Sequence, residues 1–134
     1  MVDRPLPRPS PLTEPFWNAA RGHELHVQHC QDCGHYVFYP RYLCPDCGGD
    51  RLEWRRVSGR GTVFTYTVAR RPTHPAFADR VPYVIAVVEL EEGPKLTTNI
   101  VGIDPESVSI GLPVQATWED TGDIVLVNFE PRAR

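Results

Sequence analysis

The stretch Cys30-Gln31-Asp32-Cys33-Gly34 has a second copy of the same form, Cys44-Pro45-Asp46-Cys47-Gly48, and the two hold all four cysteines of the chain. In a C-x-x-C-G motif a tight turn presents two sulfurs to one metal ion, and the glycine gives the backbone the freedom that the turn needs. The ten residues from 34 to 43 suffice for a hairpin and are too few for a domain. We therefore predict a zinc ribbon in which Cys30, Cys33, Cys44 and Cys47 bind one structural Zn²⁺ ion.

Other uses of four cysteines fit the sequence less well. A disulfide framework suits a small secreted chain, but residues 1–10 are rich in proline and lack the apolar core of a signal peptide, so we expect a reduced, cytoplasmic protein. A thioredoxin-like redox site needs one C-x-x-C beside a βαβ pattern. Iron in the same cage is the alternative occupant. His29 and His35 are alternative ligands, although four thiolates already complete a structural site.

The composition is that of an ordinary folded domain without a membrane span. Of the 134 residues, 41% are hydrophobic, which allows a real core. The longest apolar run, residues 83–88, is far shorter than the roughly 20 residues that a bilayer-spanning helix needs. The formal net charge of −3 gives no overall attraction to nucleic acid or to an anionic membrane, so any such binding would have to be local.

The first half of the chain predicts an arm, a short helix and the ribbon. Residues 1–12 carry prolines at positions 5, 7, 9 and 11 and have no apolar period, which predicts a flexible, extended arm. A helix with Thr13 as N-cap and Gly22 at its end would place Phe16 and Trp17 on one side. Short strands, one of them at 36–39, accompany the two cysteine motifs. We therefore expect the arm at 1–12, the helix and ribbon at 13–57, and a barrel at 58–134.

Five strands are predicted in the second half, at residues 61–68, 83–90, 95–101, 114–118 and 124–129. Each run is rich in β-branched and aromatic residues, and turn-forming residues separate the runs. Asp104 as cap and Pro105 at the first helical position predict one helical turn between the third and fourth strands. This is the plan of an OB-fold, although an SH3-like barrel gives a similar pattern. The predicted fold class is mainly β: an N-terminal helical segment, a rubredoxin-like zinc ribbon and a five-stranded OB-fold barrel.

Several further motifs accompany the cysteines in a fixed order. They are Phe16-Trp17, Pro40-Arg41 between the two cysteine motifs, Ser58-Gly59-x-Gly61, Thr65-Tyr66-Thr67, Pro82-Tyr83 and Ile110-Gly111-x-Pro113-Val114. In this ordered set the chain resembles the Zn-ribbon OB-fold proteins associated with acyl-CoA, long filed as a domain of unknown function. The resemblance extends from about residue 15 to residue 129 and keeps all four metal-ligand positions. It implies the same order of helix, ribbon and OB-fold.

The resemblance also implies an accessory subunit rather than an enzyme. Members of the family resemble subunits that pair with thiolase-superfamily partners such as acyl-CoA acyltransferases, aldolases and hydroxymethylglutaryl-CoA synthase assemblies. The partner then holds the catalytic groups, and this chain, as part of a hetero-oligomer or as a homodimer, scaffolds the complex and helps to shape its acyl-CoA site. No catalytic residue is predicted, because the sequence contains no G-x-S-x-G motif or phosphate-binding loop and its cysteines are assigned to the metal.

Seven side chains are candidate contacts to acyl-CoA or to the partner. Two are aromatic residues near a chain end, where burial within the chain competes with docking on another protein. Four are arginines, which bind phosphate bidentately but also serve as ordinary solvated surface. The set is Phe16, Trp17, Arg55, Arg56, Arg70, Arg71 and His74.

Two other functions remain open from the sequence. A nucleic-acid-binding module is the main alternative, because ribbons and OB-folds both serve that purpose and arginines surround Trp54. Against it, the chain has a single lysine, and three glutamates, at 89, 91 and 92, accompany the most apolar strand. An autonomous enzyme would need His74 as its base, with Tyr66 and Asp79 as the only obvious companions.

Overall fold

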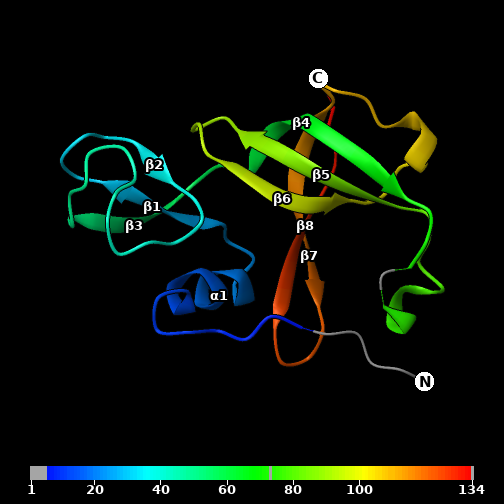
Figure 1. Cartoon of the computed structure of the whole chain (residues 1–134), viewed down its shortest axis with the longest axis horizontal. Coiled ribbons are helices and arrows are strands. Elements are labelled where there is room, and N and C mark those ends of the chain that lie inside the picture. The colour runs from blue at the N-terminus through cyan, green and yellow to red at the C-terminus, as the bar shows by residue number, and fades with distance from the viewer. Residues whose placement is uncertain (1–5, 73, 134) are drawn as a thin grey trace.

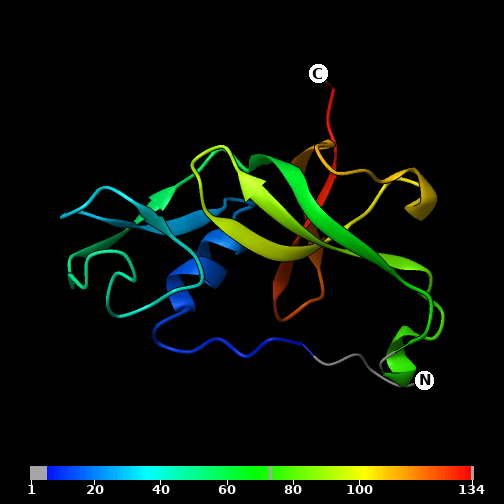
Figure 2. The same cartoon turned by 45° about the horizontal axis from the view of Figure 1, so that its top comes forward.

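The chain folds into a small zinc-ribbon-like sheet and a closed barrel that lie side by side, with one helix beneath their junction (Figures 1 and 2). The computed structural model describes residues 6–72 and 74–133. In order, its elements are α1 (Glu14–Arg21), β1 (His26–Cys30), β2 (Tyr36–Val37), β3 (Leu52–Arg56), β4 (Arg60–Ala69), the 3₁₀ turn η1 (Pro75–Phe77), β5 (Tyr83–Leu90), β6 (Lys95–Ile100), the 3₁₀ turn η2 (Pro105–Ser107), β7 (Pro113–Asp120) and β8 (Val125–Pro131). Across these described residues, no helix has the length and apolar character needed to cross a bilayer.

Helix α1 begins and ends near the predicted residues, but different groups cap it. Thr13 occupies the N-cap position without a side-chain capping bond to the helix; instead its hydroxyl accepts a hydrogen bond from the Ser10 N–H (2.9 Å). At the C-terminus Gly22 keeps a negative φ, and His23 adopts the left-handed conformation, with φ of 59°. The N–H groups of His23 and Glu24 then bond the carbonyls of Ala20 (2.9 Å) and Ala19 (3.0 Å). This hydrogen-bond pattern is the one that commonly closes a helix around a left-handed residue.

The ribbon sheet has the strand order β2-β1-β3, and all its pairings are antiparallel. Strand β2 has two residues, whereas the sequence predicted a strand at 36–39. The reason lies in the next two side chains. The Phe38 ring packs against Phe16, with 5.7 Å between centroids, and the Tyr39 hydroxyl accepts a hydrogen bond from the Thr97 N–H (3.1 Å). Contacts with α1 and the barrel therefore draw residues 38 and 39 away from the ribbon sheet.

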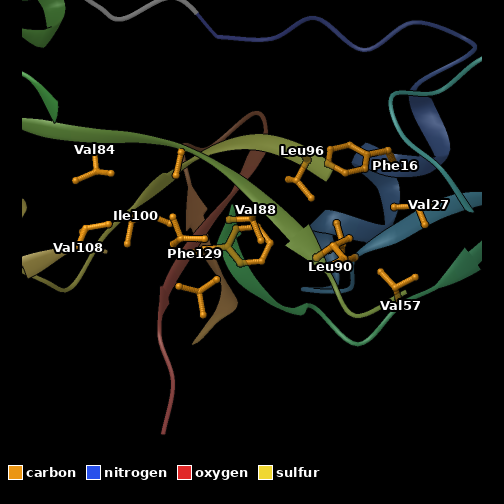
Figure 3. Packing of buried hydrophobic residues seen from close by; sticks show 14 residues of the cluster. Phe16, Val27, Val57, Val84, Val88, Leu90, Leu96, Ile100, Val108 and Phe129 are labelled. Atoms are coloured by element: carbon orange, nitrogen blue, oxygen red, sulfur yellow. The ribbon is translucent and has the colours of Figure 1, made fainter. Parts of the chain in front are cut away.

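The barrel has the strand order β4-β5-β6-β8-β7. The turn η2 lies between β6 and β7, the third and fourth barrel strands along the chain, as predicted. Inward-facing Val63, Val88, Val114 and Phe129 are almost completely buried. Figure 3 shows that this core continues past Leu96 and Leu90 to residues outside the barrel: Phe16 of α1, Val27 of β1 and Val57. The ribbon, the helix and the barrel therefore share one hydrophobic core.

One seam of the barrel is only loosely closed. Strands β6 and β8 run parallel and pair only at Ile100 and Phe129, whereas the antiparallel pairings of β5 with β6 and of β7 with β8 extend over six and seven residue pairs. Beyond that point, the Thr98 hydroxyl donates to the Val127 carbonyl (3.3 Å). Helix α1 packs beside this seam, with Phe16 next to Leu96 (Figure 3).

Candidate metal centre and predicted contact residues

The four cysteines converge on one point at the end of the ribbon. Their Sγ atoms all lie within 4.8 Å of one another, and the pairs Cys30–Cys47 and Cys33–Cys44 are each 3.6 Å apart. Tetrahedral zinc with Zn–S bonds of about 2.3 Å requires sulfurs roughly 3.8 Å apart. The side chains therefore fit a metal ion held by four thiolates without rearrangement of the backbone.

Two similar turns place the sulfurs. The N–H of Gly34 bonds the Cys30 carbonyl (2.9 Å), and the N–H of Gly48 bonds the Cys44 carbonyl (2.8 Å). Both glycines have φ near 80°, at 80° and 76°, a conformation that side chains disfavour. The predicted role of a glycine after each C-x-x-C is thus confirmed by the backbone.

Backbone donors already favour a thiolate at Cys30. The Cys33 N–H, and with it the Asp32 N–H, lowers the pKa of Cys30 to about 7 against the penalty of burial. At Cys33 the His35 N–H also favours the thiolate, but burial and the neighbouring thiols outweigh it and raise the pKa to about 12. The pKa of Cys47 is likewise raised, because nearby Cys30 and burial outweigh the Gly49 N–H. One thiol therefore ionises easily, and at least two require the positive charge of a metal.

The two histidines beside the first motif lie outside the group of four ligand atoms. The Nδ1 atom of His35 lies 3.3 Å from the Cys33 sulfur and 3.7 Å from an Asp46 carboxylate oxygen. The His29 ring packs edge-on against Tyr36, with 4.7 Å between centroids. The arrangement favours the four thiolates as the ligand set, with His35 as a neighbour that contacts one ligand.

The ribbon arginines do not converge on a common point. Arg55 and Arg56 are neighbours on β3 and so extend to opposite faces of the sheet. A guanidinium nitrogen of Arg55 reaches the Gln31 side-chain oxygen (3.5 Å), and Arg56 lies 3.9 Å from the Glu24 carboxylate. The pKa of Glu24 is lowered, first by its hydrogen bond with His26 and then by Arg56.

The other three polar candidates lie at the far end of β4, away from the ribbon (Figure 1). Arg70 forms an ion pair with Glu106 of η2, and Arg71 next to it is exposed. The Nδ1 atom of His74 accepts a hydrogen bond from the Ala76 N–H (3.0 Å) and so caps η1. The structure therefore divides the predicted polar contact residues between two ends of the molecule.

The aromatic candidates line a cavity that the sequence did not predict. Phe16 is 7% exposed and packs edge-on against Trp17, with 4.8 Å between ring centroids. Both rings border a cavity of about 280 Å³ between α1, residues 38–40 and the seam of the barrel. Asn99 and Asn128 line this cavity as well. The sequence predicted both residues on strands, but a strand prediction carries no information on which strand edges meet.

Two domain families match the chain in succession. Residues 17–53 match the rubredoxin-like zinc ribbon domain of ChsH2, and residues 54–119 match the C-terminal OB-fold domain of ChsH2. The predicted ribbon and OB-fold are thereby confirmed, and the SH3-like alternative is wrong.

Several named proteins are similar in sequence. The chain is 42% identical to the probable enoyl-CoA hydratase alpha subunit of Thermomonospora curvata, over 87% of this chain and 36% of that protein. It is 40% identical to the DUF35 domain-containing scaffold protein of Methanocaldococcus jannaschii, over 75% of this chain and 73% of that protein. The chain thus spans about a third of the hydratase subunit and most of the scaffold protein.

Two solved structures are also similar. One is a chain of an Ltp2-ChsH2(DUF35) aldolase, with 37% identity and a TM-score of 0.83, over 94% of this chain and 98% of that chain. The other, a DUF35 protein of unknown function from Sulfolobus solfataricus, is 16% identical with a TM-score of 0.62 and supports the fold alone. From its two domain matches, its identity to the scaffold protein and its shared fold, the chain belongs to the DUF35 family, with a ChsH2-like zinc ribbon followed by an OB-fold.

Proposed function

We propose that this chain is a non-catalytic accessory subunit that binds a thiolase-like partner, an acyl-CoA acyltransferase or an aldolase, and helps to scaffold the complex or shape its acyl-CoA site. The observation that carries the proposal is the similarity to a chain of the Ltp2-ChsH2(DUF35) aldolase, which extends over 98% of that chain. The relatives named scaffold proteins support the same role.

The thiols and imidazoles are the candidate reactive side chains for catalysis, and each makes a contact with a structural role. The thiols face the metal centre. The five histidines each contact a neighbour: His23 stacks on Trp118, His26 bonds Glu24, His29 packs on Tyr36, His35 contacts Cys33, and His74 caps η1. A nucleophile with an activating base in reach is the first requirement of acyl-transfer chemistry. These contacts favour a subunit whose partner supplies the chemistry.

The metal in the cysteine cage is, in this proposal, structural zinc. Four thiolates leave no open position for a substrate, and the sulfur spacing suits a tetrahedral ion. Reduced thiols fit the cytoplasm, where we place the protein. Iron is the alternative occupant, and the metal content of the purified protein distinguishes the two, since four-thiolate iron absorbs visible light and zinc does not.

Exposed apolar side chains of the ribbon support a docking role. Between the two cysteine motifs, Tyr39, Tyr42 and Leu43 are 51%, 74% and 56% exposed. A soluble monomer rarely clusters large apolar side chains in this way, and such patches mark protein interaction sites. We therefore assign residues 39–43, here called the ribbon loop, to the contact with the thiolase-like partner.

The arrangement of surface charges gives little support to a nucleic-acid-binding function. Four of the arginines that could contact phosphates lie within 4.0 Å of carboxylates: Arg51 with Asp32, Arg56 with Glu24, Arg60 with Glu91, and Arg70 with Glu106. Each pair removes net positive charge from the surface that a nucleic-acid strand would follow. Binding of a single-stranded oligonucleotide with a steep salt dependence, lost in Arg55→Glu/Arg56→Glu, would revive this alternative.

Co-expression with a thiolase-like protein encoded beside the gene tests the proposal. We expect both chains and the metal to elute in one peak of size-exclusion chromatography, larger than this chain or its homodimer alone. The isolated, metal-replete chain should not turn over an acyl-CoA thioester. An enzyme-like rate from the isolated chain, abolished by His74→Ala without loss of fold, would refute the accessory role.

A further inference from the structure

The loosely closed seam between β6 and β8 lies along a groove with two compartments. The first is the cavity of about 280 Å³ next to α1, bordered by Phe16, Trp17, Leu96 and Val127. A second cavity of about 280 Å³ lies between the seam, Phe77 and Arg80 of the β4–β5 connection, and Tyr83 at the start of β5. Asn99, Leu126 and Asn128 line both cavities. We call the two together the seam groove.

The first compartment suits a hydrocarbon. Its walls are mainly aromatic and aliphatic side chains from α1, residues 38–40, β6 and β8. A cavity of about 150 Å³ holds a six-carbon ring, so one of nearly twice that size has room for roughly ten carbons. Transfer of such a chain from water into apolar surroundings is favourable in proportion to the area buried.

The boundary between the compartments offers hydrogen-bond donors. Asn99 Nδ2 donates to the Val84 carbonyl (2.9 Å), and Asn128 Nδ2 donates to the Glu119 carboxylate (3.1 Å). A carboxamide nitrogen carries two N–H groups, so one hydrogen bond on each side chain leaves a second N–H for a ligand. Both side chains are half-buried, and at such a position a hydrogen bond discriminates well between ligands that have an acceptor and ligands that lack one.

The second compartment has balanced charges. Arg80 lies 4.0 Å from the Glu119 carboxylate, and the pair is partly exposed. Arg80 would attract a ligand with an ionised carboxylate, and Glu119 would repel it, because the two opposite charges lie side by side. A neutral carbonyl, accepting hydrogen bonds from the two asparagines, fits this boundary better than a charged head group.

We propose that the seam groove binds a neutral medium-chain acyl compound: the aliphatic chain lies against Phe16, Trp17, Leu96 and Val127, and the carbonyl oxygen accepts hydrogen bonds from Asn99 and Asn128. The inference deepens the proposed function and rests on it for the source of the ligand, since an acyl thioester is the substrate class of the proposed partner. The binding itself takes place on this chain alone.

Three matched ligands test the inference on the whole 134-residue chain in its metal-replete form by titration calorimetry. They are S-decanoyl-N-acetylcysteamine, the S-acetyl analogue without the long chain, and the S-decyl thioether without the carbonyl. We expect the decanoyl thioester to bind. The acetyl compound should bind at least about a hundredfold more weakly than the decanoyl thioester, and the thioether about tenfold more weakly. Amide resonances of Leu96 and Val127 should shift with the decanoyl ligand.

One pair of variants adds a second readout. Asn128→Leu removes one of the two donors and should reduce the difference between thioester and thioether, whereas Asn18→Leu, an equivalent change at an exposed position on α1 outside the groove, should preserve it. No binding of the decanoyl thioester, equal binding of the acetyl compound, or equal binding of the thioether to the native protein would overturn the inference. These outcomes concern this chain without a partner, so they are independent of whether the complex with the thiolase-like protein forms.

Discussion

His23 shows how a single residue joins two parts of the molecule. It adopts φ of 59° at the end of α1, a conformation that costs a residue with a side chain roughly 1–2 kcal/mol relative to the right-handed one. Its ring stacks on Trp118 of β7, with 5.7 Å between centroids and 10° between planes. The backbone cost is thus offset by a contact that fixes the end of the helix to the barrel.

Two substitutions at position 23 separate the cost of the left-handed backbone from the gain of the ring stacking. His23→Ala should lower the free energy of unfolding by about 0.5–1.5 kcal/mol, because the stacking is lost while the left-handed backbone stays strained. His23→Gly should be the more stable of the two variants by about 1 kcal/mol, because glycine adopts this φ without strain. Denaturant unfolding measures both. If the alanine variant proved as stable as the glycine variant, backbone strain at residue 23 would be negligible.

The ribbon as an element depends on its metal. Cys33→Ser or Cys47→Ser should lose the bound metal and unfold the ribbon, since the binding free energy of a structural metal is also folding free energy. The barrel should stay folded with a lower melting temperature, because Val27 and Val57 belong to its core. Hydrogen exchange with metal analysis measures this: amides of β1 and β3 lose protection, and those of β5 keep it.

His35→Ala is the matched control, because His35 contacts Cys33 without joining the group of four ligand atoms. It should retain the metal. A serine variant with full metal content and a protected ribbon would contradict the assigned ligand set.

The affinity of the ribbon for zinc should increase with pH. The raised pKa values of Cys33, about 12, and of Cys47 mean that both thiols are protonated at neutral pH in the metal-free protein and release their protons when the metal binds. Release of at least these two protons lowers the dissociation constant by about a hundredfold or more for each unit of pH between 7 and 8. Below the Cys30 pKa of about 7 a further proton makes the dependence steeper. Competition with a chromophoric chelator at several pH values measures the slope, and a constant affinity would contradict the assignment.

The elements were predictable from the sequence where local chemistry decides them. The glycines at 34 and 48 and the cap at Asp104 act within a few residues, and each appears as expected: the Asp104 carboxylate accepts from the Glu106 N–H (2.9 Å). The errors occur where distant contacts decide. Strand β2 is shorter than predicted because Phe38 and Tyr39 contact α1 and β6. His74 is a different case: it was a candidate contact residue or base, and its capping of η1 is a local interaction that was not predicted from the sequence.

At the scale of the whole molecule, the shared core explains why the candidate sites lie where they do. Ribbon and barrel have one hydrophobic cluster, and α1 packs beside the seam between β6 and β8. Residue composition and the flanking turns predicted β6 and β8 as strands, but their loose parallel contact joins residues far apart in the chain, and no local signal predicts it. The seam groove is therefore a product of topology, and the metal centre is a product of local sequence.

Assembly with the proposed thiolase-like partner should depend on the ribbon loop. Tyr42→Glu introduces a charge at a side chain that is 74% exposed, so it should leave the fold and the metal intact while it disrupts an apolar interface. We expect the dissociation constant of the complex with the thiolase-like partner to rise at least about tenfold. Ile110→Glu is the matched control, because Ile110 is 70% exposed and lies in the connection between η2 and β7, outside the ribbon loop. Equal weakening by both variants would indicate a general effect of negative charge, and no weakening by Tyr42→Glu would place the interface on another face of the protein.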